Sequence, residues 1–490
     1  MDFVNSDFWQ QLFVLPGDHI TWWAEVIRSV LRVVIGLVMF LAAVPILVWG
    51  ERRLLALLQG RLGPNRVGPQ GLLQPLADAL KLMMKEDIIP TNVDKVLYIL
   101  APGVALAPIV LSITVIPWNG SRDWGAVAPR LDIGILFVLA AASIEVYGVI
   151  TAGWSSNNKY SLLGGLRASS QVISYELGMG LAVLAVLLMS GTLAMQNLVM
   201  GYDAIHPFAH NLAPGLELSN GQGLVYVEPI AGSNYTVFQH DWKSGFWDWN
   251  VLKLFPFGLI AAGVYMISMI AETNRAPFDL PEAETELVAG FHTEYSSFKF
   301  AMFFMGEYAN MMIVSAICTT LFFGGWLAPW GLIGQIPASA GGIIPDWFIS
   351  WFNAFWSIGW FMGKTFGLVA LIILVRATFP RLRYDMLMRF GWKGLLPVAL
   401  TNLVLIAVSL GFQEYFRESG SVAAWWAGQL IAWALMGAIL GTLFVIRMRS
   451  YHADKRTGRP AGGTGVQDPL PIRRGSVIVA LPPAPVGDGQ

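Results

Sequence analysis

The sequence contains few charged residues and almost no cysteine. Charged side chains make up 13% of the 490 residues, about half the share found in an ordinary globular protein. The single cysteine, Cys318, excludes a disulfide framework, a cysteine-based zinc cluster and an iron–sulfur centre held by this chain alone. None of the six histidines lies in a long apolar run, so we expect no haem between spanning helices. The net charge of −1 gives no indication of nucleic acid binding.

Apolar residues, in contrast, are abundant. Hydrophobic residues make up 55% of the chain and the mean hydropathy is +0.57, which is more than a soluble protein of this length can bury. A spanning helix needs about 20 apolar residues. Such runs predict an all-α polytopic transmembrane bundle. The nine expected helices lie near residues 26–50, 94–117, 131–153, 175–199, 254–273, 300–325, 359–379, 395–412 and 422–446.

Basic residues are distributed unevenly between the two sides of this bundle. With the N-terminus outside, 23 of the 31 lysines and arginines fall in inside loops and the tail. Six, among them Lys364, are assigned to outside loops. Because basic loops stay on the cytoplasmic side, we expect the N-terminus outside and the C-terminal tail in the cytoplasm. No eukaryotic import signal is evident, so we expect a bacterial inner membrane.

The domain organisation follows from this topology. We expect a single transmembrane bundle over residues 1–446 and a Pro/Gly-rich cytoplasmic tail over 447–490, which its composition predicts to be disordered. An insert at 200–250 is expected in an outside loop. The inside loops are expected at 51–93, 153–174 and 271–299.

Residues 72–86, LLQPLADALKLMMKE, have the apolar period of a helix. One face carries Leu73, Leu76, Leu80, Met83 and Met84, and polar residues occupy the other face. This pattern predicts an amphipathic helix in the inner membrane interface. Such a helix either anchors the protein at the membrane surface or forms the lip of an entrance for an amphiphilic ligand.

Four glutamates are expected at or near membrane depth: Glu51, Glu145, Glu176 and Glu307. A charged side chain near the membrane centre costs about 2.5–3.5 kcal/mol or more, so it usually faces a partner or water. A buried carboxyl is also a possible proton carrier. The alternative for each is a structural ion pair. The sequence favours that alternative most for Glu51, because it is followed by the basic pair 52–53.

The most acidic segment is AETNRAPFDLPEAETELVAGFHTEY, residues 271–295, which lies between two apolar runs. It carries six acids and one base, Arg275, and its prolines predict a structured loop after the fifth helix. Glu282 and Glu286 have an i,i+4 spacing, at which like charges repel unless a proton, a cation or water relieves them. A solvated acidic loop is the alternative, but the apolar residues between the acids favour a proton or polar-ligand site.

Four long segments resemble one protein family. They are ERRLLALLQGRLGPNRVGPQGLLQPLADALKLMMKE, GWSSNNKYSLLGGLRASSQVISYELGMGL, AETNRAPFDLPEAETELVAGFHTEYSSFKFAMFFMGEYANM and RATFPRLRYDMLMRFGWKGLLP. In this order they resemble the quinone-site membrane subunit of proton-pumping NADH:quinone oxidoreductase, respiratory complex I, known as the H subunit in bacteria and subunit 1 in mitochondria. The resemblance covers about residues 26–200 and 250–410, and the family's eight helices match the first eight expected here. The insert, the ninth helix and the tail depart from the family pattern.

The resemblance implies that the subunit forms the quinone entrance and part of the binding chamber, and couples quinone reduction to proton translocation. The residues that match the family's quinone path are Glu51, Arg52, Asp78, Arg167, Tyr175, Arg275 and Asp279. Those that match its line of proton-carrying acids are Glu145, Glu176, Glu272, Glu282, Glu286, Glu294 and Glu307. We also expect Tyr175 to join the hydrogen-bonded path and Arg275 either to stabilise a reduced quinone or to pair with Asp279.

The resemblance also implies substrates and partners. The quinone, either ubiquinone or menaquinone, is the substrate, and we expect no covalently bound cofactor and no metal site in this chain. FMN and iron–sulfur clusters are expected in partner subunits, and the last cluster is expected in the peripheral subunits at the quinone end. Small membrane subunits, antiporter-like subunits and membrane lipid are the other expected partners.

Three alternatives are compatible with parts of the sequence. A membrane anchor of a proton-pumping hydrogenase, or of another non-NADH dehydrogenase, shares the core, because the electron donor is not contained in this chain. A stand-alone secondary transporter is disfavoured because the sequence shows no internal repeat. A purely structural scaffold predicts that Glu145, Glu286 and Glu307 can each be replaced by glutamine without loss of turnover.

Overall fold

The computed structural model describes residues 22–119, 126–128, 131–200, 224–225, 239–240, 249–252, 255–279, 288–329, 346–417, 430–431 and 433–434. The chain divides into two compact units, residues 1–429 and 430–490. Residues 430–431 and 433–434 are helical. The rest of the second unit and most of the insert lie outside the described residues, so the ninth helix, the tail and the domain boundary stay predictions.

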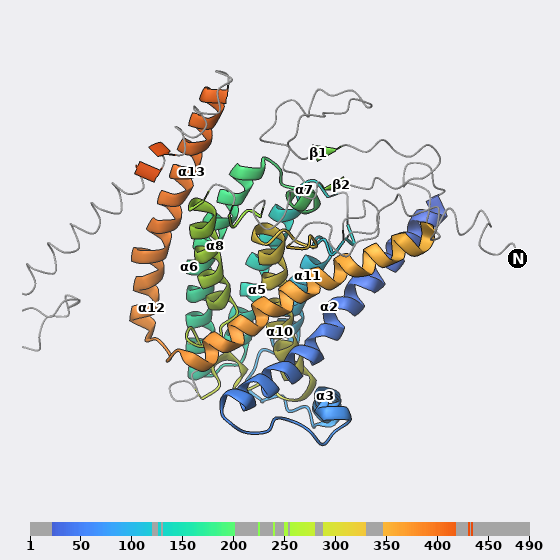
Figure 1. Ribbon diagram of the computed structural model, residues 1–490. Coiled ribbons are helices and arrows are strands. Elements are labelled where there is room, and N and C mark those ends of the chain that lie inside the picture. The colour runs from blue at the N-terminus through green and yellow to red at the C-terminus, as the bar shows by residue number, and fades with distance from the viewer. Residues whose placement is uncertain are drawn as a thin grey trace, which may run out of the picture. The chain divides into compact units, whose positions relative to one another are not determined.

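The first unit is built of helices (Figure 1). In chain order the elements are α2 (Trp22–Leu58), η3 (Pro69–Gly71), α3 (Gln74–Met84), α4 (Lys95–Ile113), α5 (Gly134–Ser155), α6 (Lys159–Ser190), α7 (Met195–Met200), β1 (Leu224–Val225), β2 (Gln239–His240), α8 (Phe257–Glu272), η7 (Gly290–His292), α10 (Ser297–Phe322), α11 (Asp346–Thr378), α12 (Tyr384–Phe390), the π-helical turn η9 (Gly391–Leu395) and α13 (Leu396–Arg417). β1 and β2 form a two-residue antiparallel pair.

The helices agree with the predicted fold class. Within the described residues, seven helical stretches are long and apolar enough to cross a membrane, the last running from α12 into α13. α8 is a shorter apolar helix of 16 residues. Together they correspond to the first eight predicted spans, and the prediction of an all-α polytopic bundle is confirmed.

The prediction was wrong about where the fourth helix begins. α6 begins at Lys159 instead of near residue 175, so most of the loop expected at 153–174 is helical. The side chain of Asn158 accepts a hydrogen bond from the Tyr160 N–H and caps the new helix start. Glu176 therefore lies in the middle of α6 and does not open it.

Small residues explain the error. Glycine and serine lower the hydropathy of the first half of α6, but several of them are buried against neighbouring elements. A Cβ built on Gly164 would lie only 2.7 Å from the Cα of Gly290. Close packing therefore stabilises this half of the helix. A search for long apolar runs does not find it, because glycine and serine are not strongly apolar.

Two other boundaries also differ from the prediction. α2 continues to Leu58, so Glu51 lies within the helix and does not close it. α11 begins at Asp346 and contains Lys364, which was assigned to an outside loop. The ammonium group of Lys364 donates to three backbone carbonyls 2.5–2.9 Å away, in residues 323–327 just after α10. A cation at a helix C-terminus is electrostatically favourable, which explains how α11 accommodates this lysine.

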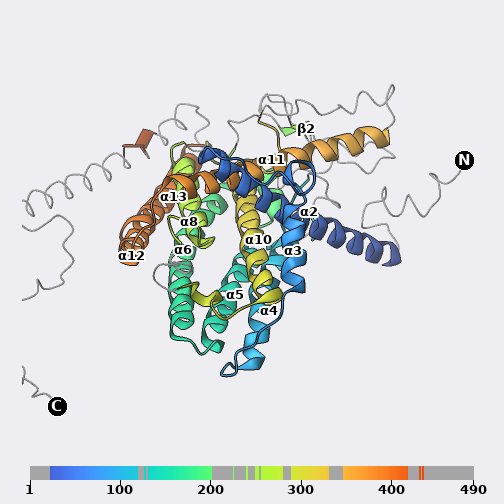
Figure 2. The same ribbon diagram turned by 90° about the horizontal axis from the view of Figure 1, so that it is seen from below.

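α10 is the central helix of the described bundle. It contacts α2, α4, α8 and α11 (Figures 1 and 2). Of the 18 residues in its most apolar stretch, 67% are buried. α4 and α5 pack closely at Gly148, where an added Cβ would lie 2.5 Å from the backbone nitrogen of Ala105. α6 contacts α5, α8 and α13. The polar residues of α10 therefore face side chains from several other helices.

The predicted amphipathic helix is confirmed as a helix, α3, which lies beside α2 and α10 (Figure 2). Its apolar residues Leu76, Leu80 and Met84 are exposed, as expected of a helix that lies in a membrane interface. The chain after α3 is fastened to the start of α10. The Ser297 hydroxyl donates to the Lys85 carbonyl at 2.7 Å, and further contacts are Ile88 N–H to Ser296 and Lys299 to Asp87.

Candidate functional site

Glu51 is the centre of a buried group of charges. It lies on α2 and only 3% of its surface is exposed. The Tyr308 hydroxyl, from α10, donates to Glu51 Oε2 at 2.5 Å. Arg376, in the last turn of α11, forms an ion pair with Glu51 Oε1. The partners of Glu51 therefore come from distant parts of the sequence and not from the adjacent arginines.

Arg275 lies between two carboxylates. It follows α8 in the turn 273–279 and is 7% exposed. Its Nη1 lies 3.8 Å from Glu51 Oε1, and its Nη2 lies 3.9 Å from Glu307 Oε2. The guanidinium also lies over the Tyr308 ring, 4.6 Å from the centroid, which is a cation–π contact. The two distances are nearly equal, so a movement of about 1 Å can bring Arg275 into direct contact with either carboxylate.

His292 completes this group on the other side of Glu307. It lies in η7, is 6% exposed, and its Nε2 lies 3.3 Å from Glu307 Oε1. The rings of Phe291, Phe300 and Phe303 pack around the imidazole. We call the set Glu51, Arg275, His292, Glu307, Tyr308 and Arg376 the arginine cluster.

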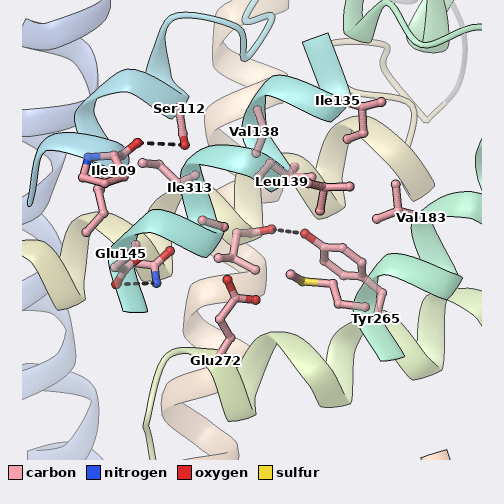
Figure 3. Close-up of a pocket in the computed structure, with 16 residues that line it drawn as sticks. Ile109, Ser112, Ile135, Val138, Leu139, Glu145, Val183, Tyr265, Glu272 and Ile313 are labelled. Atoms are coloured by element: carbon pink, nitrogen blue, oxygen red, sulfur yellow. Dashed lines mark hydrogen bonds between the residues drawn. The ribbon is translucent and has the colours of Figure 1, made fainter. Parts of the chain in front are cut away.

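A second group of acids lines a small cavity inside the bundle (Figure 3). Glu145 from α5 and Glu272 from α8 both line it, together with Tyr265 and Asn310. The cavity has a volume of about 20 Å³, which is space for roughly one water molecule. All its other lining residues are apolar except Ser112. We call this site the acid cavity.

The carboxylates of the acid cavity have few protein partners. The Asn310 side chain donates to Glu145 Oε1 at 3.2 Å. Glu272 Oε2 is buried and has no hydrogen-bond partner among the described residues. Tyr265 donates its hydroxyl hydrogen to the Val314 carbonyl at 3.2 Å, so only its lone pairs remain for a second contact. A water molecule is the group that fits both the volume and the unsatisfied oxygen.

The two sites are joined by short stretches of chain. Glu307 of the arginine cluster and Asn310 of the acid cavity are three residues apart on α10, so they lie on the same face of that helix. Glu272 and Arg275 are likewise three residues apart, at the end of α8 and in the turn that follows. Movement or protonation at one site can therefore affect the other over a short distance.

Two predicted proton-path acids lie elsewhere. Glu176, on α6, accepts a hydrogen bond from the Ser143 hydroxyl of α5 at 2.5 Å. Glu294 accepts one from the Asn158 side chain at 2.6 Å, beside the start of α6. Burial raises the pKa of its neighbour Tyr295 to about 12, so the neutral hydroxyl is the form present near neutral pH. Glu282 and Glu286 lie outside the described residues.

The predicted quinone-path residues outside the arginine cluster form separate contacts. Arg52 pairs with Asp78 of α3 at 2.5 Å, which ties the amphipathic helix to α2. Asp279 pairs with Arg381 at 2.7 Å. Arg167 lies partly buried on α6. The Tyr175 hydroxyl donates a hydrogen bond to the Leu387 carbonyl of α12 at 3.0 Å.

Sequence reasoning missed several members of these sites. They are His292, Tyr308, Asn310, Tyr265 and Arg376. Tyr308 directly follows Glu307, and Asn310 lies one helical turn after it, so their position on the same helix was a usable signal. Arg376 lies in a basic stretch of the sequence, and no local pattern indicates its pairing with a glutamate 325 residues earlier.

Comparisons with known proteins agree with this architecture. The family model described as NADH dehydrogenase matches residues 31–407. A second H subunit of the NADH-quinone oxidoreductase of Koribacter versatilis (strain Ellin345) is 42% identical over 395 residues, which are 78% of this chain and 96% of that protein. The H subunit of the NADH-quinone oxidoreductase of Rickettsia rickettsii (strain Iowa) is 41% identical over 384 residues, 78% of this chain and 94% of that protein. The chain therefore belongs to the NADH dehydrogenase family and is a multi-pass membrane subunit of an NADH-quinone oxidoreductase.

Proposed function

We propose that this subunit forms part of the quinone chamber at the arginine cluster and couples quinone reduction to proton movement through the acid cavity. The observation that carries the proposal is the position of Arg275, 3.8 Å from Glu51 and 3.9 Å from Glu307. Glu307 in turn lies one helical turn before Asn310, the hydrogen-bond partner of Glu145. A change of charge near Arg275 can therefore affect Glu307 and, one helical turn further along α10, the hydrogen bond of Asn310 to Glu145 in the acid cavity.

The substrate is a quinone of the ubiquinone or menaquinone class, which takes up two electrons and two protons to become a quinol. The electrons come from an iron–sulfur centre of a peripheral partner subunit, reduced by NADH through FMN. α3, with its exposed leucines and methionines, forms the entrance for the apolar quinone tail. The Arg52–Asp78 pair holds this helix in place.

The residues of the arginine cluster respond to the added negative charge. Arg275 is attracted toward the reduced quinone and away from Glu51 and Glu307. Glu307 then loses part of its compensating positive charge and takes up a proton. His292 lies 3.3 Å from Glu307 and can exchange that proton.

The acid cavity passes the proton onward. Glu145 and Glu272 line one space that has room for a water molecule, and such a water can bridge carboxyl groups that do not touch. Glu176 and Ser143 extend the polar path between α5 and α6. Small membrane subunits and antiporter-like subunits are the proposed receivers. The proposed location is the bacterial inner membrane, with the arginine cluster toward the cytoplasm.

The test uses the intact complex in sealed vesicles. Glu145→Gln and Glu307→Gln keep the side-chain shape but remove the exchangeable carboxyl proton. We expect both to lower NADH-driven quinone reduction and proton pumping by about 10-fold or more. Oxidation of NADH by a hydrophilic acceptor, which bypasses the quinone, measures how much assembled enzyme is present.

Ser112→Ala is the matched control, because Ser112 lines the same cavity but donates to its own helix at the Pro108 carbonyl. We expect normal turnover from this variant. Normal quinone reduction and pumping in both glutamine variants would show that these carboxylates are structural only, and would overturn the proposal.

A further inference from the structure

The turn that carries Arg275 is held by a residue that neither the sequence motifs nor the proposed function assign. Gln171 lies on α6 and none of its surface is exposed. Its amide nitrogen donates to the Ala271 carbonyl at 2.7 Å and to the Phe278 carbonyl at 2.7 Å. A side-chain amide has two hydrogens, so these two short bonds use both.

These two carbonyls lie at the two ends of the segment that contains Arg275. Ala271 belongs to the last turn of α8, and Phe278 closes the turn through its N–H bond to the Arg275 carbonyl at 2.9 Å. One amide group therefore fixes both ends of the segment from Ala271 to Phe278. The Asn274 side-chain oxygen, 3.3 Å from the same nitrogen, lies within the turn.

The next turn of α6 supports the same segment. The ring of Tyr175 packs against Phe278 with 5.6 Å between centroids. The oxygen of the Gln171 amide, by contrast, is buried without a hydrogen-bond partner among the described residues. A buried polar atom without a partner destabilises the fold. The two hydrogen bonds donated by the amide nitrogen must therefore offset the cost of burying the amide oxygen. This points to the two donated bonds as the reason for an amide at this position.

The position of Arg275 needs such control. Among the described residues, its contacts with Glu51 and Glu307, at 3.8 and 3.9 Å, are about 1 Å longer than a direct charged hydrogen bond. A shift of about that size toward one carboxylate would turn that contact into a direct pair and change how the guanidinium is shared. The backbone of the turn therefore determines how Arg275 is shared between Glu51 and Glu307.

We propose that Gln171 is a positioning residue for quinone reduction, which acts by fixing the Arg275 turn between Glu51 and Glu307. It does not contact the quinone or the reacting atoms. The inference rests on the proposed function, because it assumes that Arg275 takes part in turnover. It adds a residue on α6 that sets the geometry of that step.

The test compares Gln171→Met, which keeps the volume and removes both donors, with Asn402→Leu in the whole complex. Asn402 is a buried amide that donates to the Phe257 carbonyl at 3.1 Å, at the other end of the same helix α8. Turnover is normalised to NADH oxidation by a hydrophilic acceptor. We expect Gln171→Met to lower quinone reduction about 10-fold, because a misplacement near 1 Å can cost up to about 100-fold in other active sites and the turn keeps its other contacts. Asn402→Leu should change it by less than about twofold.

A double-mutant cycle separates positioning from general destabilisation. If Gln171 acts through Arg275, Gln171→Met should cost about 10-fold in the natural background but less than about twofold in the Arg275→Lys background. If Gln171→Met does not assemble, Gln171→Glu replaces it in the cycle with Arg275→Lys. This variant keeps the side-chain length and changes only the amide NH2 to an oxygen. We expect it to lower turnover as well, because a carboxylate repels the two carbonyls.

The outcomes distinguish the inference from the function on which it rests. If Arg275→Lys lowers turnover and the Gln171 variants do not, the positioning role is wrong and the proposed function stands. If Arg275→Lys has no effect, the proposed role of the arginine cluster fails and the inference fails with it. Equal losses from Gln171→Met and Asn402→Leu, or full additivity with Arg275→Lys, would also overturn the inference.

Discussion

The arginine cluster and the acid cavity both contain buried carboxylates, but they compensate them in different ways. In the arginine cluster, Glu51 and Glu307 are matched by Arg275 and Arg376. Among the described residues that line the acid cavity there is no lysine, arginine or histidine. The two sites lie within three residues of each other on α10.

This difference suits the two sites to two different tasks, the sensing of a charge and the transfer of a proton. A carboxylate that shares an arginine is sensitive to any new charge that attracts that arginine. An ionised carboxylate in a nearly apolar cavity has no such compensation, so it functions best as a group that binds and releases a proton. In the proposed function, the arginine cluster detects quinone reduction and the acid cavity carries protons.

The largest expected effect comes from removing the shared cation. Arg275→Met leaves Glu51 and Glu307 without the guanidinium between them. Removing a group that stabilises charge as it develops in a reaction costs about 100- to 1,000-fold in rate, so we expect quinone reduction to fall by about 100-fold or more. The measurement is NADH-driven quinone reduction, normalised to NADH oxidation by a hydrophilic acceptor.

Arg32→Met is the control for this variant. Arg32 is also a buried arginine on the same bundle, paired with Glu25 at 2.6 Å, but it lies on α2 about five helical turns before Glu51. We expect its turnover per assembled complex to stay within about twofold of normal. Comparable losses from both variants would mean that buried arginines matter here for stability alone.

A smaller effect is expected in the acid cavity. Glu272→Gln keeps a polar group on the cavity wall but removes the exchangeable carboxyl proton, so we expect proton pumping and quinone reduction to fall by about 10- to 100-fold. Pumping in sealed vesicles, measured with a pH-sensitive dye, checks this result. Pumping at the normal rate would remove Glu272 from the proton path.

Tyr308→Phe tests a single contact within the arginine cluster. The variant keeps the ring beneath Arg275 and removes the 2.5 Å hydrogen bond to Glu51. A hydrogen bond to a charged group contributes about 1.5–3 kcal/mol, and the lower end of this range corresponds to about 10-fold. Because Arg376 still pairs with Glu51, we expect a loss of about 10-fold in turnover. An unchanged rate would indicate that Arg376 alone is sufficient to hold Glu51.

The smallest effect is expected at the exposed pair that ties α3 to α2. The Arg52 and Asp78 side chains are 43% and 25% exposed, so solvent screens their attraction. We expect Arg52→Met to change turnover less than about threefold, with the change mainly in the KM for long-tailed quinones. A loss as large as that of Arg275→Met would place Arg52 within the chemistry and not at the entrance.

The sequence predicted most of the helices because apolar runs are local signals. It failed at the start of α6, where buried glycine and serine replace hydropathy with close packing. Membrane depth predicted Glu51, Glu145 and Glu307 as candidate site residues, and the family resemblance added Glu272 and Arg275. The sequence could not give their partners, because Arg376 meets Glu51 only after distant helices have packed, and His292 meets Glu307 only through the fold of the segment between η7 and α10. It also could not find Gln171, since an amide within a helix has no distinguishing local pattern.

The most direct test of the coupling between the two sites is an infrared difference spectrum of the complex, recorded as the bound quinone is reduced. The account predicts a protonation change in the carboxyl stretching region that is lost in both Glu307→Gln and Glu145→Gln. An unchanged carboxyl signal in both variants, with quinone reduction proceeding at the normal rate, would contradict the claim that the arginine cluster signals to the acid cavity.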